Sequence, residues 1–161
     1  MEAVSQVIVR NADRLQGPDA LLLNPAPDTL GRELTAKGLD IRASTAHHGV
    51  FRQIDALGIE TQFEALPTIP PSCQSLVMVL PREKDLLRML LHRCATGMPK
   101  DGTLWLVGEN RSGIKSAPRH LRDFFASVSK VDSARHCGLL AARQPMIDKP
   151  FSIHAVSYTH L

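Results

Sequence analysis

The sequence predicts one α/β domain with a mainly parallel β-sheet that ends in an antiparallel hairpin. Three observations predict this class: apolar runs without polar alternation, helical segments between them, and two final β-type runs joined by a short connection. The chain has 161 residues, of which 43% are hydrophobic and 22% are charged. This composition suits one soluble domain with a single core.

The first half of the chain begins with an expected strand at 20–23, whose apolar run ends where Pro25 and Pro27 interrupt a strand ladder. A helix should follow, with Asp28 as its cap and Lys37-Gly38 as its C-terminal signal. The weaker signals after it predict a strand at 39–43, a short helix near 50–57 and a strand near 59–63.

The second half of the chain has clearer patterns. Residues 75–80 are almost continuously apolar, which is typical of a strand buried on both faces of a parallel sheet. Leucines then recur at helical spacing from Leu86 to Cys94. The remaining expected elements are a turn at 98–102, a strand at 103–107, a helix at 114–125, and two antiparallel strands at 128–131 and 137–142.

Several classes of protein are excluded by the sequence. No apolar run approaches the ~18 residues of a membrane span, and the N-terminus lacks the pattern of a signal peptide. The adjacent His47 and His48 have no Cys, Asp or Glu at zinc spacing, so a loop or helix-end role is favoured. We therefore expect a cytoplasmic protein with no metal and no membrane partner. Structural thiols are expected at Cys73, Cys94 and Cys137, and surface histidines at His92 and His120.

Positive charge is concentrated in residues 108–143, which carry seven Lys and Arg against three Asp and Glu. Lys115, Arg119 and Arg122 fall on one stripe of the expected helix. This stripe favours two interpretations equally: a surface that tracks a phosphate backbone, and an ordinary solvated face. The candidate RNA-binding residues are Arg111, Lys115, Arg119 and Arg135.

Two of these candidates have an alternative role within the fold. Arg111 and Arg135 would hold Glu109 and Asp132 if the loop after residue 107 were fixed against the closing hairpin. The same loop differs from a nucleotide-binding P-loop, because Ile114 separates the second glycine from the lysine. Two readings of the loop remain: a tight turn, or a helix N-terminus that grips a phosphate or an acidic side chain.

The order of elements in the second half is similar to that of a class I methyltransferase, a Rossmann-like fold. Such an enzyme needs a glycine-rich turn after its first strand, so that the backbone approaches S-adenosylmethionine closely. This chain has Asn24-Pro25-Ala26-Pro27 at that position, without glycine. It has Leu80-Pro81-Arg82-Glu83 where amino-group methyltransferases carry Asn-Pro-Pro-aromatic. The sequence therefore predicts a degenerate fold with no cofactor loop, no catalytic residue and no bound cofactor.

Two stretches carry a resemblance to a known family. They are LVGENRSGIKSA at 106–117 and KVDSARHCGL at 130–139, and they resemble the N-terminal domain of bacterial 16S ribosomal RNA guanine-N2 methyltransferases of the RsmC type. The opening SQVIVRNA at 5–12 is similar to the start of that family, whereas residues 24–72 match it only loosely. The resemblance implies two tandem domains: a degenerate first copy, and a second copy that binds S-adenosylmethionine and methylates a guanine amine.

The resemblance also sets the expected domain limits. Residues 1–148 would form the degenerate N-terminal domain, and residues 149–161 would be the start of a linker followed by a non-native tail. The last seven residues resemble translated sequencing adaptor, so we expect the chain to stop before the catalytic half. The segment 151–161 is expected to be loosely attached.

The leading hypothesis is a non-catalytic N-terminal domain that supports a catalytic C-terminal domain and contributes to binding of 16S ribosomal RNA or the small ribosomal subunit. The parent protein would be an S-adenosylmethionine-dependent transferase, and this part alone would be inactive. A stand-alone RNA- or protein-binding module is the alternative. A third hypothesis is an autonomous methyltransferase with an unusual cofactor turn.

Overall fold

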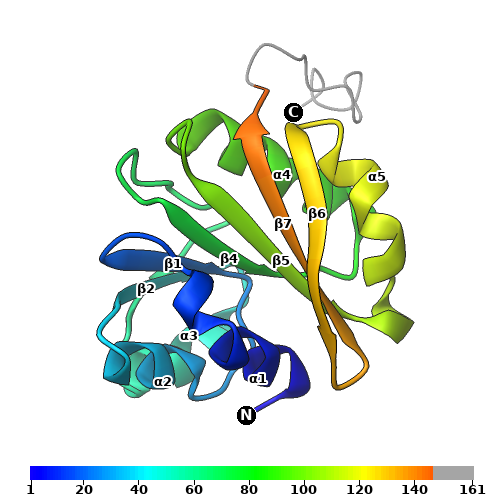
Figure 1. The fold of residues 1–161 in the computed structure, drawn as a ribbon. Coiled ribbons are helices and arrows are strands. Elements are labelled where there is room, and N and C mark those ends of the chain that lie inside the picture. The colour runs from blue at the N-terminus through cyan, green and yellow to red at the C-terminus, as the bar shows by residue number, and fades with distance from the viewer. Residues whose placement is uncertain (147–161) are drawn as a thin grey trace.

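The computed structural model describes residues 1–146, so the expected boundary at 148 and the expected tail lie outside the described residues. In the described part, seven strands form one sheet in the order β3-β2-β1-β4-β5-β7-β6 (Figure 1). The strands are β1 (Asp19–Leu23), β2 (Asp40–Thr45), β3 (Glu60–Phe63), β4 (Ser75–Val79), β5 (Thr103–Glu109), β6 (Phe125–Ala134) and β7 (Cys137–Pro145).

The sheet has the strand directions that the sequence predicts. β1 pairs in parallel with β2 and β4, β2 pairs with β3, and β4 pairs with β5. β7 runs antiparallel to both of its neighbours, β5 and β6. The closing hairpin therefore places β7, the last strand in residues 1–146, between β5 and β6. A mainly parallel sheet with an antiparallel C-terminal hairpin is confirmed.

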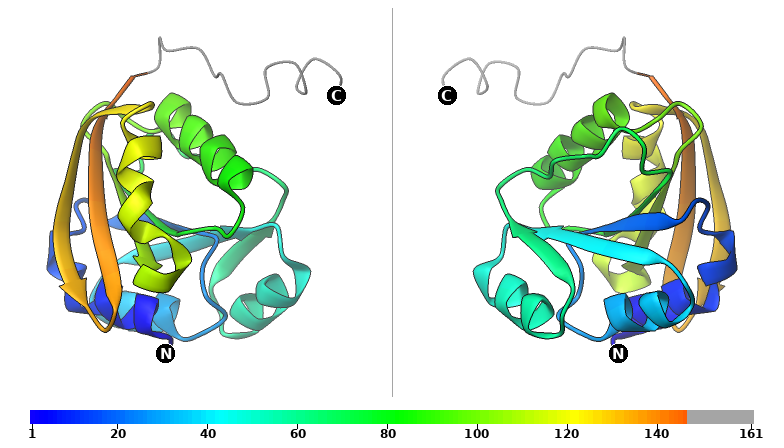
Figure 2. Two further views of the ribbon diagram at one scale, coloured as in Figure 1. Left: turned by 90° about the vertical axis from the view of Figure 1, so that its right-hand side faces the viewer. Right: turned by 90° about the vertical axis from the view of Figure 1, so that its left-hand side faces the viewer.

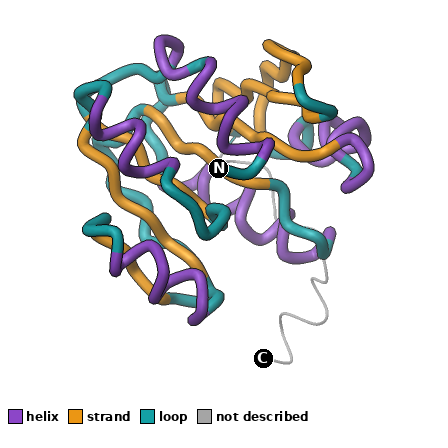
Figure 3. The backbone as a smooth tube through the Cα atoms, turned by 90° about the horizontal axis from the view of Figure 1, so that it is seen from below, coloured by secondary structure: helices purple, strands orange, loops and turns teal. Residues whose placement is uncertain are grey.

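Helices cover both faces of this sheet (Figure 2). α1, α2 and α3 bury their apolar residues on one face, and α4 and α5 bury theirs on the other. Figure 3 shows the two helical layers flanking the strands from below. The helices are α1 (Ala3–Arg10), α2 (Leu30–Ala36), α3 (His48–Ala56), α4 (Lys84–Gly97) and α5 (Ala117–Leu121).

The central strands are buried on both faces, which explains their continuous apolar runs. In β1, Leu21 and Leu23 face the core under α4 and α5, whereas Ala20 and Leu22 face the core under α1 and α2. All four side chains are at most 4% exposed. Burial on two faces removes the polar alternation that a one-sided sheet would show.

The helix expected at 114–125 is confirmed only over α5, Ala117–Leu121. Two 3₁₀ turns, η2 (Asn110–Ser112) and η3 (Ile114–Ser116), precede the short α5, and Phe125 already begins β6. Gly113 separates the two turns with a left-handed backbone at φ 95°, which interrupts any continuous helix. Pro118 lacks an N–H group and is tolerated only in the first turn of the helix that follows.

The N-terminal helix α1 is an element that the sequence analysis left unassigned. It has no side-chain cap at Glu2 and no acidic residue in its first turn, so the usual start signals are missing. Val4, Val7 and Ile8 are nevertheless buried, and the helix packs against α2, β5 and β7. Tertiary packing therefore stabilises this helix more than its own sequence does.

The three cysteines are reduced and buried, as their spacing predicts. Burial raises the pKa of the Cys94 thiol far above its usual range, because the thiolate would lose its hydration in the core. Cys73 and Cys137 have raised pKa values for the same main reason. No helix in residues 1–146 is long and apolar enough to cross a membrane.

Candidate nucleic-acid interface

The four candidate RNA-binding residues are all exposed, but they are not gathered into one group. Arg111 lies in η2, Lys115 in η3, Arg119 in α5, and Arg135 in the turn between β6 and β7. The short 3₁₀ turn before α5 changes the helical phase that the sequence suggested. As a result, Lys115 lines a cavity that Arg119 does not line.

Arg111 forms the local pair that the sequence offered as its alternative role. Its Nε donates to Glu109 Oε2 at 2.7 Å, and its side chain is still 85% exposed. Exposed ion pairs of this kind contribute little to stability because water screens them. Glu109 therefore holds Arg111 only weakly at the surface.

Arg135 does not hold Asp132, so the second half of that alternative is wrong. Asp132 instead pairs with residues from the other end of the chain: Arg10 Nε lies 2.9 Å from its carboxylate, and Asn11 Nδ2 donates to it at 2.8 Å. Arg135 lies in the hairpin turn with a positive φ of 52°, next to His136 at 60°. Hairpin turns of this type require such backbone angles, so Arg135 is placed by the turn and not by an acid.

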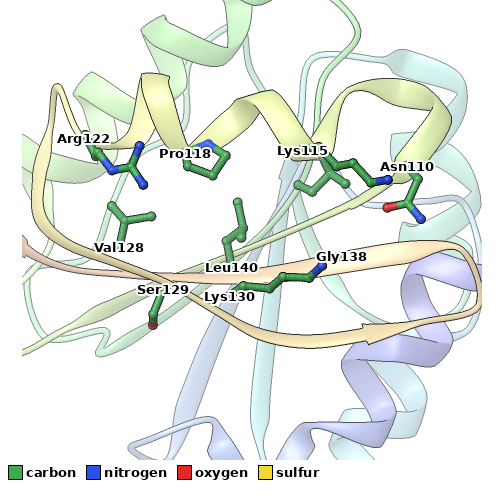
Figure 4. A pocket seen from close by; sticks show the side chains of 10 residues that line it. Asn110, Lys115, Pro118, Arg122, Val128, Ser129, Lys130, Gly138 and Leu140 are labelled. Atoms are coloured by element: carbon green, nitrogen blue, oxygen red, sulfur yellow. The ribbon is translucent and has the colours of Figure 1, made fainter.

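A cavity of about 250 Å³ lies between η3, α5 and the hairpin (Figure 4). Lys115, Arg122 and Lys130 line it from three different elements, namely η3, the end of α5 and β6. Arg122 belongs to the basic stripe that the sequence predicts but is not one of the four candidate residues, and neither is Lys130. Lys130 reaches the cavity because it pairs with Leu140 across the hairpin, and no local sequence pattern predicts this pairing.

The turn after β1 occupies the position where a class I methyltransferase would hold its cofactor. Asn24 has a positive φ of 51°, and its N–H donates to Ser44 O at 3.1 Å. Its side-chain amide donates to Val79 O at 2.9 Å, so one residue ties β1 to both β2 and β4. Pro25 and Ala26 after it are buried.

The space beside this turn is small. A cavity of about 30 Å³ lies among Leu23, Asn24, Thr45 and the loop with Glu64, which is room for one or two water molecules. Cavities for drug-sized ligands measure roughly 300–1,000 Å³, which is about ten times this volume or more. The Ser44 hydroxyl at the end of β2 donates a hydrogen bond to Glu64 Oε2 at 2.9 Å, so this polar group already has a protein partner. The 30 Å³ cavity beside Asn24 therefore has no room for S-adenosylmethionine.

The histidines take structural roles. His47 caps α3, where its Nδ1 accepts from Val50 N at 3.2 Å, as the helix-end interpretation predicts. His92 and His120 are only partly exposed, so their surface assignment is wrong in part: His120 lies 3.3 Å from Arg88, and His92 stacks edge-on against Phe124. Burial lowers the pKa of both imidazoles, with nearby arginines adding to the effect. No group of three potential metal ligands is present in residues 1–146.

The sequence and the fold have known counterparts. The family model described as "Methyltransferase small domain N-terminal" matches residues 5–159. Proteins named ribosomal RNA small subunit methyltransferase C are similar to this chain: one from Shewanella piezotolerans is 34% identical over 83% of this chain and 40% of the relative. One from Yersinia pestis is 32% identical over 89% of this chain and 42% of the relative.

Solved structures share the fold at lower identity. The T. thermophilus 16S rRNA N2 G1207 methyltransferase, solved in complex with AdoMet and guanosine, superposes with a TM-score of 0.76 at 18% identity over 93% of this chain and 41% of its own. A TehB-like SAM-dependent methyltransferase from Corynebacterium glutamicum gives 0.65 at 9% identity, over 89% of each chain. The chain spans less than half the length of the curated relatives it matches. With a family match across nearly its whole length, this chain belongs to the methyltransferase small domain N-terminal family.

Proposed function

We propose that this chain acts as the non-catalytic N-terminal domain of a cytoplasmic 16S ribosomal RNA guanine-N2 methyltransferase. In this role it supports a catalytic domain that binds S-adenosylmethionine, and it contributes cations that contact ribosomal RNA. The observation that carries the proposal is the combination of family membership with a closed cofactor position at Asn24.

The closed position argues for a supporting role. Backbone N–H groups in a glycine-rich turn normally approach the cofactor, and here two prolines remove two such donors. The side chain of Asn24 is already used between β1 and β4. A domain that keeps the methyltransferase sheet but fills its cofactor cleft retains surfaces for packing and binding, while the chemistry belongs to the catalytic partner.

Isothermal titration calorimetry with S-adenosylmethionine tests the closed cleft. We expect the 161-residue chain to show no binding tighter than a Kd of about 100 μM, which corresponds to about −5.5 kcal/mol. The control is a class I methyltransferase domain with an intact glycine-rich turn. Binding tighter than this limit would mean that the chain holds cofactor itself, and the autonomous-enzyme hypothesis would replace ours.

The proposed RNA contact uses Arg111, Lys115, Arg119 and Arg135, which are exposed on the basic segment 108–143. Each phosphate that such a cation neutralises releases counterions, so affinity should fall steeply as salt rises. We expect the double variant Lys115→Ala/Arg119→Ala to weaken binding to 16S ribosomal RNA fragments and to flatten the salt slope by about 1 to 2 units.

A matched control is the double variant Arg32→Ala/Lys37→Ala, which removes the same charge from exposed positions in and next to α2. It should leave the RNA salt slope near that of the parent chain. If Arg135→Ala unfolds the chain while Lys115→Ala/Arg119→Ala leaves RNA binding unchanged, the basic segment is structural and the RNA role belongs elsewhere.

A further inference from the structure

We infer that the cavity lined by Lys115, Arg122 and Lys130 binds one nucleotide unit of an RNA chain, with the phosphates on its two sides meeting the cations at the two ends of the cavity and its sugar and base on the apolar floor. This inference rests on the proposed function, because it specifies which part of an RNA strand binds at one site on the domain. We call this cavity the hairpin pocket.

The charge of the hairpin pocket is uncompensated. No acidic side chain of residues 1–146 lines it. The segment 108–143 contains three carboxylates, and each is held by an arginine outside the pocket: Glu109 by Arg111, Asp123 by Arg88 and Asp132 by Arg10. Figure 4 shows Lys115 and Lys130 toward the end with Asn110, and Arg122 toward the other end, beside Val128. Cations without a neighbouring acid attract an anion with several acceptor oxygens, and a phosphate group supplies these.

The floor of the hairpin pocket is apolar. Ile114 and Leu140 are 2% and 4% exposed, and the half-buried Val128 lies beside them. Asn110 lines the end near Lys115, as Figure 4 shows, and its amide offers both a donor and an acceptor. A sugar or base face can therefore cover the floor while its polar edge meets an amide, an arrangement that a free inorganic anion does not need.

The size of the pocket selects a single unit. At about 250 Å³ it is slightly smaller than the ~300–1,000 Å³ of cavities for drug-sized ligands, so it has room for one nucleotide and not for a stacked pair. Gly138 lines this space next to Ile114 and Lys130. A Cβ there would lie 3.4 Å from Ile114 and 4.0 Å from Lys130 Cε, so the lysine side chain passes directly above the glycine.

The neighbouring cations favour an RNA strand over a free nucleotide as the ligand. Asn110 N–H donates to His136 O at 2.8 Å, so the hairpin turn with Arg135 lies at one end of the pocket. Arg119 lies on α5, directly after Pro118, which lines the same pocket. Flanking phosphates of an RNA strand would meet these exposed cations, whereas a free nucleotide has no flanking phosphates. A disordered acidic peptide would offer carboxylates but no planar ring for the floor.

Methyl-detected NMR on the 161-residue chain tests this inference with five probes: adenosine 5′-monophosphate, adenosine, inorganic phosphate, a single-stranded RNA hexanucleotide and an acidic peptide. We expect the monophosphate and the hexanucleotide to shift the methyl signals of Ile114, Val128 and Leu140 in a saturable manner, with the hexanucleotide binding more tightly. Arg122→Gln and Lys130→Gln should each weaken both ligands by about tenfold, which is about 1.4 kcal/mol. Arg32→Gln on α2 is the charge-matched control and should weaken neither.

Four outcomes would overturn the inference. Inorganic phosphate could reproduce the shifts with the midpoint of the monophosphate, which would leave only a general anion site. The monophosphate could bind without competition from the hexanucleotide, which would indicate a free nucleotide. An acidic peptide could displace the hexanucleotide from the pocket, which would indicate a protein partner. RNA binding could depend on Lys115 and Arg119 but not on Arg122 and Lys130, in which case the proposed function stands and the pocket does not.

The proposed function fails in a different way. It fails if neither the hexanucleotide nor 16S ribosomal RNA fragments bind the chain at low salt, and the inference fails with it. Because the variants Arg122→Gln and Lys130→Gln change exposed or pocket-lining side chains, we expect their methyl spectra without ligand to match those of the parent chain. That comparison separates a lost binding site from a lost fold.

Discussion

Asp132 joins the two ends of the described chain. Its carboxylate accepts from Asn11 Nδ2 and from the N–H of Ser133, both at 2.8 Å, and it pairs with Arg10 at 2.9 Å. These hydrogen bonds and the arginine charge hold the pKa of Asp132 below its usual range. The charged form is therefore the one that the folded state stabilises.

This lowered pKa predicts how stability depends on pH. Asp132→Asn should unfold more easily than the parent chain at neutral pH, because it loses the charge that Arg10 and Asn11 stabilise. The contribution of Asp132 is fully present above the unfolded-state pKa of about 3.9 and is lost as pH falls through the lower folded-state value. Urea unfolding of both proteins between about pH 7 and pH 2.5 should show the difference shrinking only below about pH 4.

An exposed acid supplies the control for this measurement. Asp55→Asn on α3 should change the free energy of unfolding by no more than about 0.5 kcal/mol at any pH in the series. A difference between the parent chain and Asp132→Asn that stays constant down to the lowest pH would show that the carboxylate acts by shape and not by charge.

Single residues show where sequence reasoning reaches its limit. The pair of Arg111 with Glu109 was predictable, because the two residues lie two positions apart at the end of one strand. The partner of Asp132 was not, because Arg10 lies 122 positions away and only the folded hairpin brings them together. Lys130 was overlooked for the same reason, since its neighbours in the hairpin pocket come from η3 and β7.

At the scale of elements, α5 separates a core side from a solvent side within five residues. Leu121 is fully buried against the sheet, whereas Arg119 two positions earlier is exposed. Leu121→Ala should therefore cost about 2–5 kcal/mol in the free energy of unfolding, because the cavity it leaves is only partly refilled. Urea denaturation should show this as a lower midpoint with an unchanged slope.

Arg119→Ala is the control on the same helix, and it should change the free energy of unfolding by no more than about 0.5 kcal/mol. Equal effects of the two substitutions would mean that α5 does not pack on the sheet through Leu121.

The success of the element predictions follows from burial. β1, β4 and β5 are covered on both faces, so their sequences are continuous apolar runs that cannot be mistaken for loops. The helix expected at 114–125 is shorter than predicted, because Gly113 and Pro118 restrict where a helix can begin and Phe125 already belongs to β6. α1 went unassigned because its two turns lack start signals and depend on partners distant in sequence.

At the scale of the whole molecule, α1 seals the face formed by β5 and β7. Removing residues 1–11 should uncover Val107 and Leu139, which are otherwise at most 1% exposed. Loss of the buried side chains of Val4, Val7 and Ile8, each worth roughly 1.5–3 kcal/mol, approaches the 5–15 kcal/mol that stabilises an ordinary domain. We expect the shortened chain to bind a hydrophobic dye and to lose cooperative thermal unfolding.

The control for this deletion is Gln6→Ala, which changes a partly exposed side chain of the same helix and should leave both readouts as they are in the parent chain. Cooperative unfolding of the shortened chain, without dye binding, would show that the rest of the domain closes without α1.

The position of β7 determines when the described sheet becomes complete during synthesis. β6 emerges from the ribosome first, yet within the described sheet its partner is β7, which also supplies the second neighbour of β5. α1 is made at the start and waits for the same strand, a delay on the order of ten seconds at translation rates of about 5–20 residues per second. A nascent chain therefore exposes apolar surface on α1 and unpaired strand edges on β5 and β6 until residue 145 has left the ribosome. During that interval the exposed apolar surface is accessible to a chaperone.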